Sequence, residues 1–138
     1  MGVVFSQLEI INQDYKQGKY STIEEAKIVA AHTISQYRYG SEGKDYFWIQ
    51  ESVNDRPYMV MHPYLTSLNG TDISQYEDQK GNQIFLKAQN VCNKQDSTEG
   101  EGYLRYYWIY YNNQNITKLK LSFVKAFDDW GWIIGSGV

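Results

Sequence analysis

The stretch from Asp45 to Pro63 constrains the fold more than any other part of this chain. Two runs rich in aromatic and apolar residues, 46–49 and 58–61, flank a short polar segment that contains Asn54-Asp55. Such runs are typical of strands, and asparagine and aspartate tolerate turn geometry. The pattern predicts an antiparallel hairpin that forms the floor of a binding pocket, with His62 at the mouth.

Composition indicates one acidic domain without covalent cross-links. The 138 residues suit a single core, and a net charge of -3 with a pI near 5.3 gives no basic surface for nucleic acid. Cys92 is the only cysteine, which excludes an intramolecular disulfide and a cysteine-based zinc site. The sequence has no signal-peptide pattern, and its apolar end at 132–138 reads as a strand cut short. We therefore expect a piece of a longer protein.

Two amphipathic helices are predicted before the hairpin. Apolar residues at 4, 8, 11 and 15 recur at helical spacing, and Gly18 follows as a helix stop. The segment 21–25 reads as a capping box, which opens a second helix that runs to about Tyr37. Helix is expected to give way to sheet near Asp45.

The second half of the chain predicts further strands and one helical insert. The turn-rich segment 64–83 is long for a plain connection, and a short helix should start near Asn82. Bulky residues on both alternating sets of 103–111 predict a strand in the middle of the sheet. The runs 118–127 and 130–138 predict a second hairpin. This order predicts an α+β fold, with helices segregated on the faces of an antiparallel sheet.

No catalytic signature is present. The sequence lacks GxSxG, P-loop, HExxH and dinucleotide-binding motifs. His62 and Asp72 could act as an acid-base pair, but a lone histidine beside a proline is more often a structural hydrogen-bonding residue. His32 lies off the apolar stripe of its helix, so a two-histidine metal site is not expected. We predict neither an enzyme nor a bound cofactor or metal.

Lys125 is the candidate for binding an anion. It shares strand parity with leucine and phenylalanine residues at 119, 121, 123 and 127, which predicts that it lies on the apolar face. An ammonium there needs an acidic partner, an exposed strand end or an anionic ligand. A lysine that extends its amine from the sheet edge into solvent is an equal alternative.

Paired aromatic residues complete the candidate site. Tyr46 and Trp48 share one parity, as do Tyr106 and Trp108, and each pair suits either a cavity wall or core packing. The predicted ligand-binding residues are Tyr46, Trp48, Met59, His62, Tyr106, Trp108 and Lys125.

In this order, the motifs resemble a single Cache domain of the second type, the PAS-like extracellular sensor of bacterial chemoreceptors, histidine kinases and diguanylate cyclases. The resemblance covers about Ser21 to the C-terminus. One departure is the run 109–113, which stands where the family usually carries a proline-containing stretch. The matching motifs are 46–49, 59–63, 68–72, Asp78 with Gly81 and Phe85, 100–103, Tyr106 with Trp108, 118–125 and 130–137.

The resemblance implies a central antiparallel sheet of about five strands, a long N-terminal helix, and a pocket roofed by the segment after His62. It implies that residues 1–20 belong to a stalk helix and that 21–138 form the sensor domain. Family members often bind small organic acids such as acetate, propionate or pyruvate, which fits the expectation for Lys125. They are bracketed by transmembrane helices, so the resemblance implies a periplasmic or other extracytoplasmic location.

The sequence thus favours a sensor that binds a small carboxylate and relays the signal to an output domain. Two alternatives stay open. One is a dimerisation module in which the apolar face of the first helix pairs with a second copy of the chain. The other is a hydrolase that uses His62 and an acidic residue, for which the sequence offers weak support.

Overall fold

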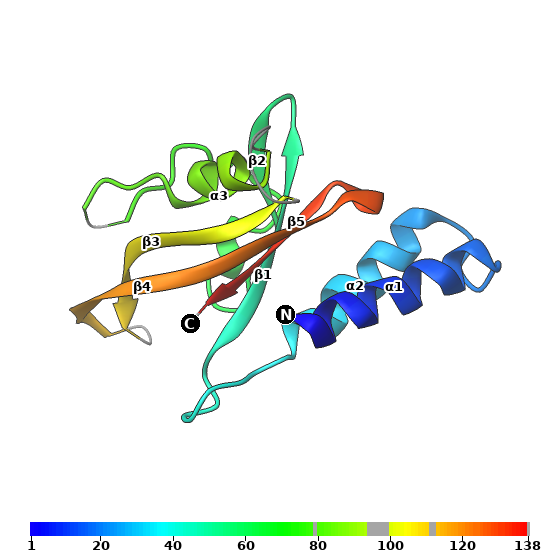
Figure 1. Cartoon of the computed structure of the whole chain (residues 1–138), viewed down its shortest axis with the longest axis horizontal. Helices are drawn as coiled ribbons and strands as arrows, with labels where there is room; N and C mark the ends of the chain where they lie inside the picture. The colour runs from blue at the N-terminus through cyan, green and yellow to red at the C-terminus, as the bar shows by residue number, and fades with distance from the viewer. Residues whose placement is uncertain (79, 94–99, 111–112, 138) are drawn as a thin grey trace.

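The structure is a computed structural model that describes residues 1–78, 80–93, 100–110 and 113–137, without the side chains of 108–110 and 113–118. Its elements confirm the predicted α+β fold (Figure 1). They are α1 (Gly2–Lys16), α2 (Ile23–Ser35), β1 (Tyr46–Val53), β2 (Arg56–Met61), η1 (Thr66–Leu68), α3 (Ile84–Cys92), β3 (Glu101–Tyr110), β4 (Asn113–Phe127), η2 (Asp128–Trp130) and β5 (Trp132–Gly137).

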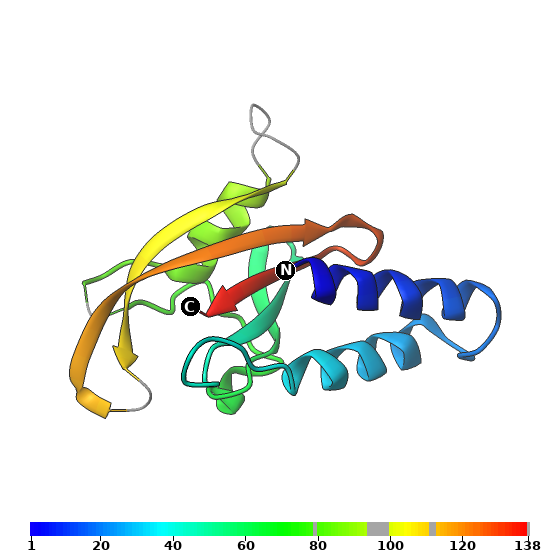
Figure 2. The same ribbon diagram turned by 60° about the horizontal axis from the view of Figure 1, so that its bottom comes forward.

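The two N-terminal helices lie side by side at one end of the molecule (Figure 2). The predicted capping box is present: the Thr22 hydroxyl accepts from the Glu25 amide, and the Glu25 carboxylate accepts from the Ser21 amide. No helix among the described residues combines the length and the apolar character needed to cross a membrane.

The predicted hairpin of β1 and β2 turns at Asn54 and Asp55, whose φ angles of 52° and 63° place both in the left-handed region. Two such residues form the turn that matches the twist of paired strands, which is why asparagine and aspartate suit it. The register slips by one residue between Ile49 and Gln50, so Val60 is the extra residue of a bulge. Met59 and Met61 consequently pack in different cores.

The sheet has the order β2-β1-β5-β4-β3, with antiparallel neighbours throughout. The prediction that 103–111 is the middle strand is therefore wrong, because β3 is an edge strand and β5 occupies the centre. The bulky residues of β3 are not covered on both faces of the sheet. Leu104 and Tyr106 are buried, whereas Tyr103 is 66% exposed. The strand predicted at 118–127 begins earlier, at Asn113, and pairs with β3.

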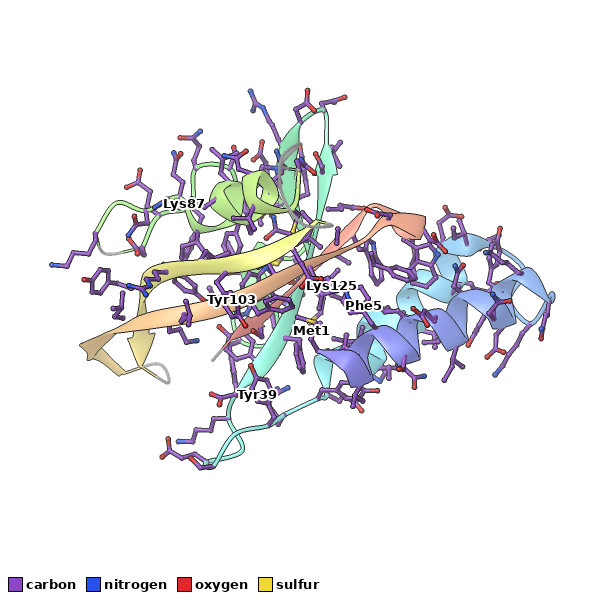
Figure 3. All side chains as sticks on the ribbon, viewed as in Figure 1. Met1, Phe5, Tyr39, Lys87, Tyr103 and Lys125 are labelled. Carbon is purple, nitrogen blue, oxygen red and sulfur yellow. The ribbon has the colours of Figure 1, made fainter. Side chains whose placement is uncertain are left out.

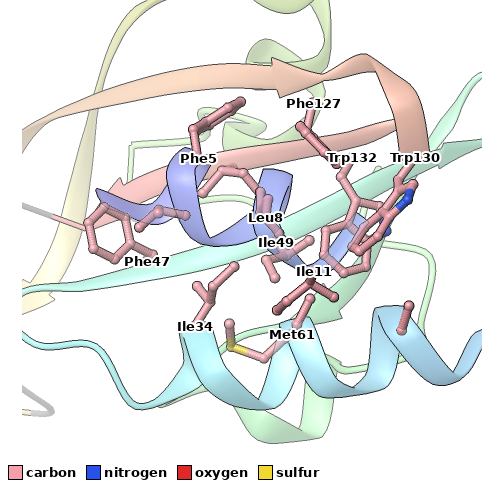
Figure 4. Packing of buried hydrophobic residues seen from close by; sticks show 14 residues of the cluster. Phe5, Leu8, Ile11, Ile34, Phe47, Ile49, Met61, Phe127, Trp130 and Trp132 are labelled. Carbon is pink, nitrogen blue, oxygen red and sulfur yellow. The ribbon is translucent and has the colours of Figure 1, made fainter. Parts of the chain in front are cut away.

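Each face of the sheet carries its own core. On one face, α1 and α2 pack mainly aliphatic and aromatic side chains, including Leu8, Ile34 and Trp132, against the sheet (Figure 4). On the other face, α3 covers a second cluster built around Trp48, Phe85 and Tyr106. The alternation of side chains along β1 and β5 divides their residues between the two cores.

Candidate functional site

Tyr46 lies at the centre of a group of polar and aromatic side chains on the α3 face of the sheet. Its ring centroid is 4.9 Å from that of His62 and 4.9 Å from that of Tyr64, and its side chain is 3% exposed. Burial raises the pKa of Tyr46 well above its usual value, so the phenol stays protonated. It therefore remains able to donate a hydrogen bond.

Two glycines of β5 make room for these rings. A Cβ at Gly137 would lie 2.4 Å from the Tyr46 ring, and one at Gly135 would lie 2.2 Å from the Trp48 indole. Both rings lie against β5 because glycine is the residue that permits such a close approach.

Lys120 brings a cation to this group from β4. Its Nζ lies 4.9 Å from the Tyr46 ring centroid, in the range of a cation–π contact. Burial lowers the pKa of Lys120 to about 8, although the charge of Asp45 acts in the opposite direction. The ammonium is thus partly removed from water, and a nearby anion would favour its charged form.

His62 is held as a neutral ring in one tautomer. Its Nδ1 accepts from the Tyr64 amide at 3.1 Å and from the Leu65 amide at 2.9 Å. The proton of the neutral ring therefore lies on Nε2. Burial and then the positive charge of Lys120 lower the pKa of His62 to about 3. Its predicted place at the mouth is wrong, since only 1% of the residue is exposed.

The neighbouring buried polar groups are fixed by hydrogen bonds. The Tyr106 hydroxyl lies 2.7 Å from the Ser122 hydroxyl, and burial raises the pKa of Tyr106. Trp48 Nε1 donates to Gln50 Oε1, and the side-chain amide nitrogen of Gln50 in turn donates to the backbone carbonyl of Phe85 in α3. These bonds tie β1 to the covering helix and set the depth of the Trp48 ring.

The structure brings most of the predicted site residues together and separates one from them. Tyr46, Trp48, Met59 and Tyr106 belong to the core under α3, and His62 contacts Tyr46. The side chain of Trp108 lies outside the described residues.

Lys125 lies on the opposite face of the sheet. Its Nζ is 4.7 Å from the Phe5 ring centroid in α1 and 3.9 Å from Glu101 Oε1 (Figure 3). The expected apolar face is present next to Lys125, where Phe5 and Phe127 are buried. It does not continue along the strand, because Leu119 and Leu121 are 57% and 48% exposed. The acidic partner that a lysine there requires is Glu101.

The sequence did not predict Lys120 as a site residue, because Lys120 belongs to an alternating set of polar residues in its strand. Lys118, Lys120 and Ser122 read as the solvent face of the strand, yet Ser122 and Val124 are fully buried on the α3 face. Val124 and Ala126 belong to the same alternating set as Lys120, and these two apolar residues were the sequence signal that this set faces a core. Tyr64 and Tyr76 also join the site from the long segment after His62. The Tyr64 ring centroid is 4.9 Å from that of Tyr46, and Tyr76 packs against the cluster that contains Tyr46.

Within the described ranges, no group of three histidine, cysteine, aspartate or glutamate side chains is placed to hold an ion. Hydroxyls, a neutral imidazole and an ammonium are instead the groups that bind a small polar anion.

Comparison with known proteins identifies relatives of the whole chain. The family model described as Single Cache domain 2 matches residues 1–138. A methyl-accepting chemotaxis protein, McpP from Pseudomonas putida, is 33% identical over 115 residues. The match covers 83% of this chain and 19% of the relative, so the chain spans about a fifth of that receptor.

Two solved structures are similar along nearly all of the chain. A periplasmic sensor domain of a chemotaxis protein has a TM-score of 0.83 and 28% identity, covering 99% of this chain and 88% of its own. A Cache chemosensory domain described for its carboxylic acid recognition has a TM-score of 0.85 and 31% identity, covering 99% and 86%.

Proposed function

Because this chain belongs to the Single Cache domain 2 family, we propose that it is the ligand-binding sensor of a bacterial transmembrane receptor and that it binds a small organic acid beside Lys120. The relatives are chemoreceptor sensor domains, and one is described for carboxylic acid recognition. The observation that carries the proposal is the placement of Lys120 Nζ over Tyr46, on the face that also holds His62 and Tyr106.

The chemistry of these groups suits a small monoanion. A carboxylate next to Lys120 gains a charge-assisted hydrogen bond and restores the charge that burial disfavours. The nearby charge of Asp45 disfavours a second negative group on the ligand. The aromatic walls of Tyr46 and Tyr106 suit a short apolar tail.

A calorimetric screen tests this proposal. Acetate, propionate and pyruvate are titrated into the protein, with acetamide and propionamide as uncharged analogues. We expect at least one acid to bind and its amide to bind far more weakly, because the amide cannot pair with the ammonium. Binding of none of the acids, or equal binding of acid and amide, would contradict the proposal.

The two lysines on opposite faces of β4 give a matched pair of variants. Lys120→Met should weaken acid binding by about 10- to 100-fold, the value of one charge-assisted hydrogen bond. Lys125→Met removes an equal charge from the α1 face and should leave affinity unchanged. If both variants weaken binding equally, the effect comes from net charge and not from a site at Lys120.

We further propose that residues 1–20 connect to a stalk and that 21–138 sense the ligand outside the cytoplasm. The periplasmic sensor domains among its relatives support this location. Val4 and Leu8 of α1 are fully buried against the sheet, so a shift of the strands on ligand binding would move α1 directly. The sensor would pass its signal to an output domain by this route.

The alternative of a dimerisation module without a physiological ligand needs a different surface from the predicted one. Val4, Leu8 and Ile11 are buried in the chain's own core and cannot pair with a partner helix. A homodimer through α1 would instead use Val3 and Ile10, which are 74% and 54% exposed. Sedimentation of wild type and a Val3→Ser, Ile10→Ser variant tests this, and a monomer at all concentrations would argue against it.

A further inference from the structure

The segment 70–78, here called the strap, is fastened to the outer edge of β2. The Gly70 amide donates to the Met59 carbonyl at 2.7 Å, and the Met59 amide donates to Thr71 at 3.0 Å. The Ile73 amide then donates to Pro57 at 2.9 Å, and the Ile73 side chain is 1% exposed. Several backbone bonds and a buried side chain therefore hold this end of the strap.

The other end of the strap is held by one carboxylate. Asp78 Oδ2 accepts from the Tyr107 amide at 2.6 Å, and Oδ1 accepts from the Lys80 and Asn82 amides at 2.9 and 2.8 Å. Tyr107 belongs to β3, the edge strand farthest from β2. The strap thus reaches from one edge of the sheet to the other, and Asp78 supplies the bond to β3.

The strap carries Tyr76 to the candidate ligand site. The Tyr76 ring centroid is 5.5 Å from that of Phe85 in α3, and Tyr76 packs against the core cluster that contains Tyr46. Tyr76 therefore lies between the fastened ends, on the same face of the sheet as Lys120.

We propose that Asp78 is a positioning residue for the ligand site: by fastening the strap to β3 it holds Tyr76 against the cluster that contains Tyr46 and slows the escape of bound acid. This inference rests on the proposed function. The two ends are unequal, because the β2 end has backbone pairing and a buried isoleucine. At the β3 end, the described residues supply one hydrogen-bonding side chain, which is partly exposed, and a contact of Lys80 with the Tyr107 ring. Local opening starts where buried contacts are fewest, so the Asp78 end opens first.

A purely structural role is the competing explanation. Asp78 also accepts from the Asn82 amide, and it occupies the Tyr107 amide, which belongs to an edge strand. Such a role would change stability without changing the rate at which ligand leaves. The dissociation rate and the exchange of the Tyr107 amide separate the two roles.

The experiment compares Asp78→Asn and Asp78→Ala with Asp72→Ala in the full chain. Asp72 is the matched control, because its carboxylate accepts from the Ser74 amide and pairs with Arg56 at the β2 end of the strap. The probe is whichever of acetate, propionate and pyruvate binds wild type, and the rates come from nuclear magnetic resonance line shapes.

We expect Asp78→Ala to speed dissociation by about tenfold, as loss of one net hydrogen bond allows, with association no slower than in wild type. Hydrogen exchange of the Tyr107 amide should rise by a similar factor. Asp72→Ala should change neither rate. An unchanged dissociation rate in the Asp78 variants, or an equal change in Asp72→Ala, would overturn the proposal.

The test still decides the proposal if a variant does not fold or if wild type binds no acid. If Asp78→Ala does not fold, Asp78→Asn preserves the side-chain shape and supplies the same readouts. If wild type binds none of the acids, the proposed function fails separately. Exchange at Tyr107 and along 74–77 then decides whether Asp78 holds the strap: faster exchange in Asp78→Asn supports it, and unchanged exchange overturns it.

Discussion

The two faces of the sheet are built from the same strands but hold different kinds of side chain. The α1 and α2 face buries mainly apolar residues such as Leu8, Ile34 and Ile49 (Figure 4). Its polar connection is Asn12, which bonds to Asp129 and to the Trp130 indole and so anchors α1 to the η2 turn. This face is organised to hold helices in place.

The α3 face also excludes water but retains polar groups among its aromatic side chains. Gln50, His62 and Ser122 are each almost fully buried there, and Lys120 lies over Tyr46. Burying such groups lowers stability unless they are hydrogen-bonded, so a face that served only for packing would replace them with apolar residues. The contrast supports the proposal that one face serves stability and the other holds the ligand site.

The largest expected effect comes from shortening a side chain in the core under α1. Leu8→Ala should lower the free energy of unfolding by about 3 kcal/mol, because it removes a fully buried side chain and leaves a cavity. Acid affinity at low temperature, where the variant stays folded, should match wild type. Urea unfolding and calorimetry measure the two quantities, and a large loss of affinity would break the division between the faces.

A substitution in β5 should affect both stability and recognition. Gly137→Ala would place a Cβ 2.4 Å from the Tyr46 ring, which must then move. Overpacking of this kind costs about 2 to 3 kcal/mol, and displacement of Tyr46 should also weaken acid binding. Gly2→Ala is the control, since no atom lies within 4 Å of the added Cβ. Equal affinity of Gly137→Ala and wild type would remove Tyr46 from the site.

His62 should make stability depend on pH. The folded state keeps His62 neutral down to a pKa of about 3, whereas the unfolded chain takes up a proton near its ordinary value of 6.5. The unfolded state therefore binds more protons in that window, and the free energy of unfolding falls as pH falls. Between pH 7 and pH 5 the contribution is about 2 kcal/mol.

Urea unfolding of His62→Asn at both pH values isolates this contribution. The side-chain carbonyl of the introduced asparagine can accept the backbone bonds that Nδ1 accepts, without titrating. The variant should lose about 2 kcal/mol less than wild type over the same pH range. His32→Asn, at an exposed position, should behave as wild type, and an identical loss in all three proteins would exclude His62 as the source.

The smallest expected effect is on acid affinity above neutral pH. Lys120 loses its proton near pH 8, and a carboxylate needs the charged form, so affinity should fall as pH rises. From pH 7 to pH 9 the expected loss is about tenfold. Calorimetry at the two pH values measures it, and Lys120→Met should show no such dependence. A constant wild-type affinity would show that the ammonium is not the anion-binding group.

Local patterns predicted the elements because their causes are local. The turn at Asn54-Asp55 and the capping box at Thr22 depend on neighbouring residues, and both are present. The hairpin around Asp128 likewise follows from a short polar turn between two apolar runs. Four of the predicted site residues share the α3 core because alternation along β1 places Tyr46 and Trp48 on one face.

The position of β3 and the orientation of β4 depend on distant parts of the chain. Both alternating sets of β4 contain apolar residues, so its sequence does not state which set faces inward. The helices decide this, because α1 and α2 cover only part of their face and leave Leu119 and Leu121 exposed (Figure 2). Lys120, on the other alternating set, faces the α3 side of the sheet and is partly buried there.

The sequence by itself determined the α+β class, the hairpins and the aromatic character of the site, since these follow from local periodicity and turn chemistry. The tertiary structure alone decided which lysine joins that site. A strand offers two faces that differ little in sequence, and only the packing of α1 against Lys125 and the burial of Ser122 beside Lys120 distinguish them.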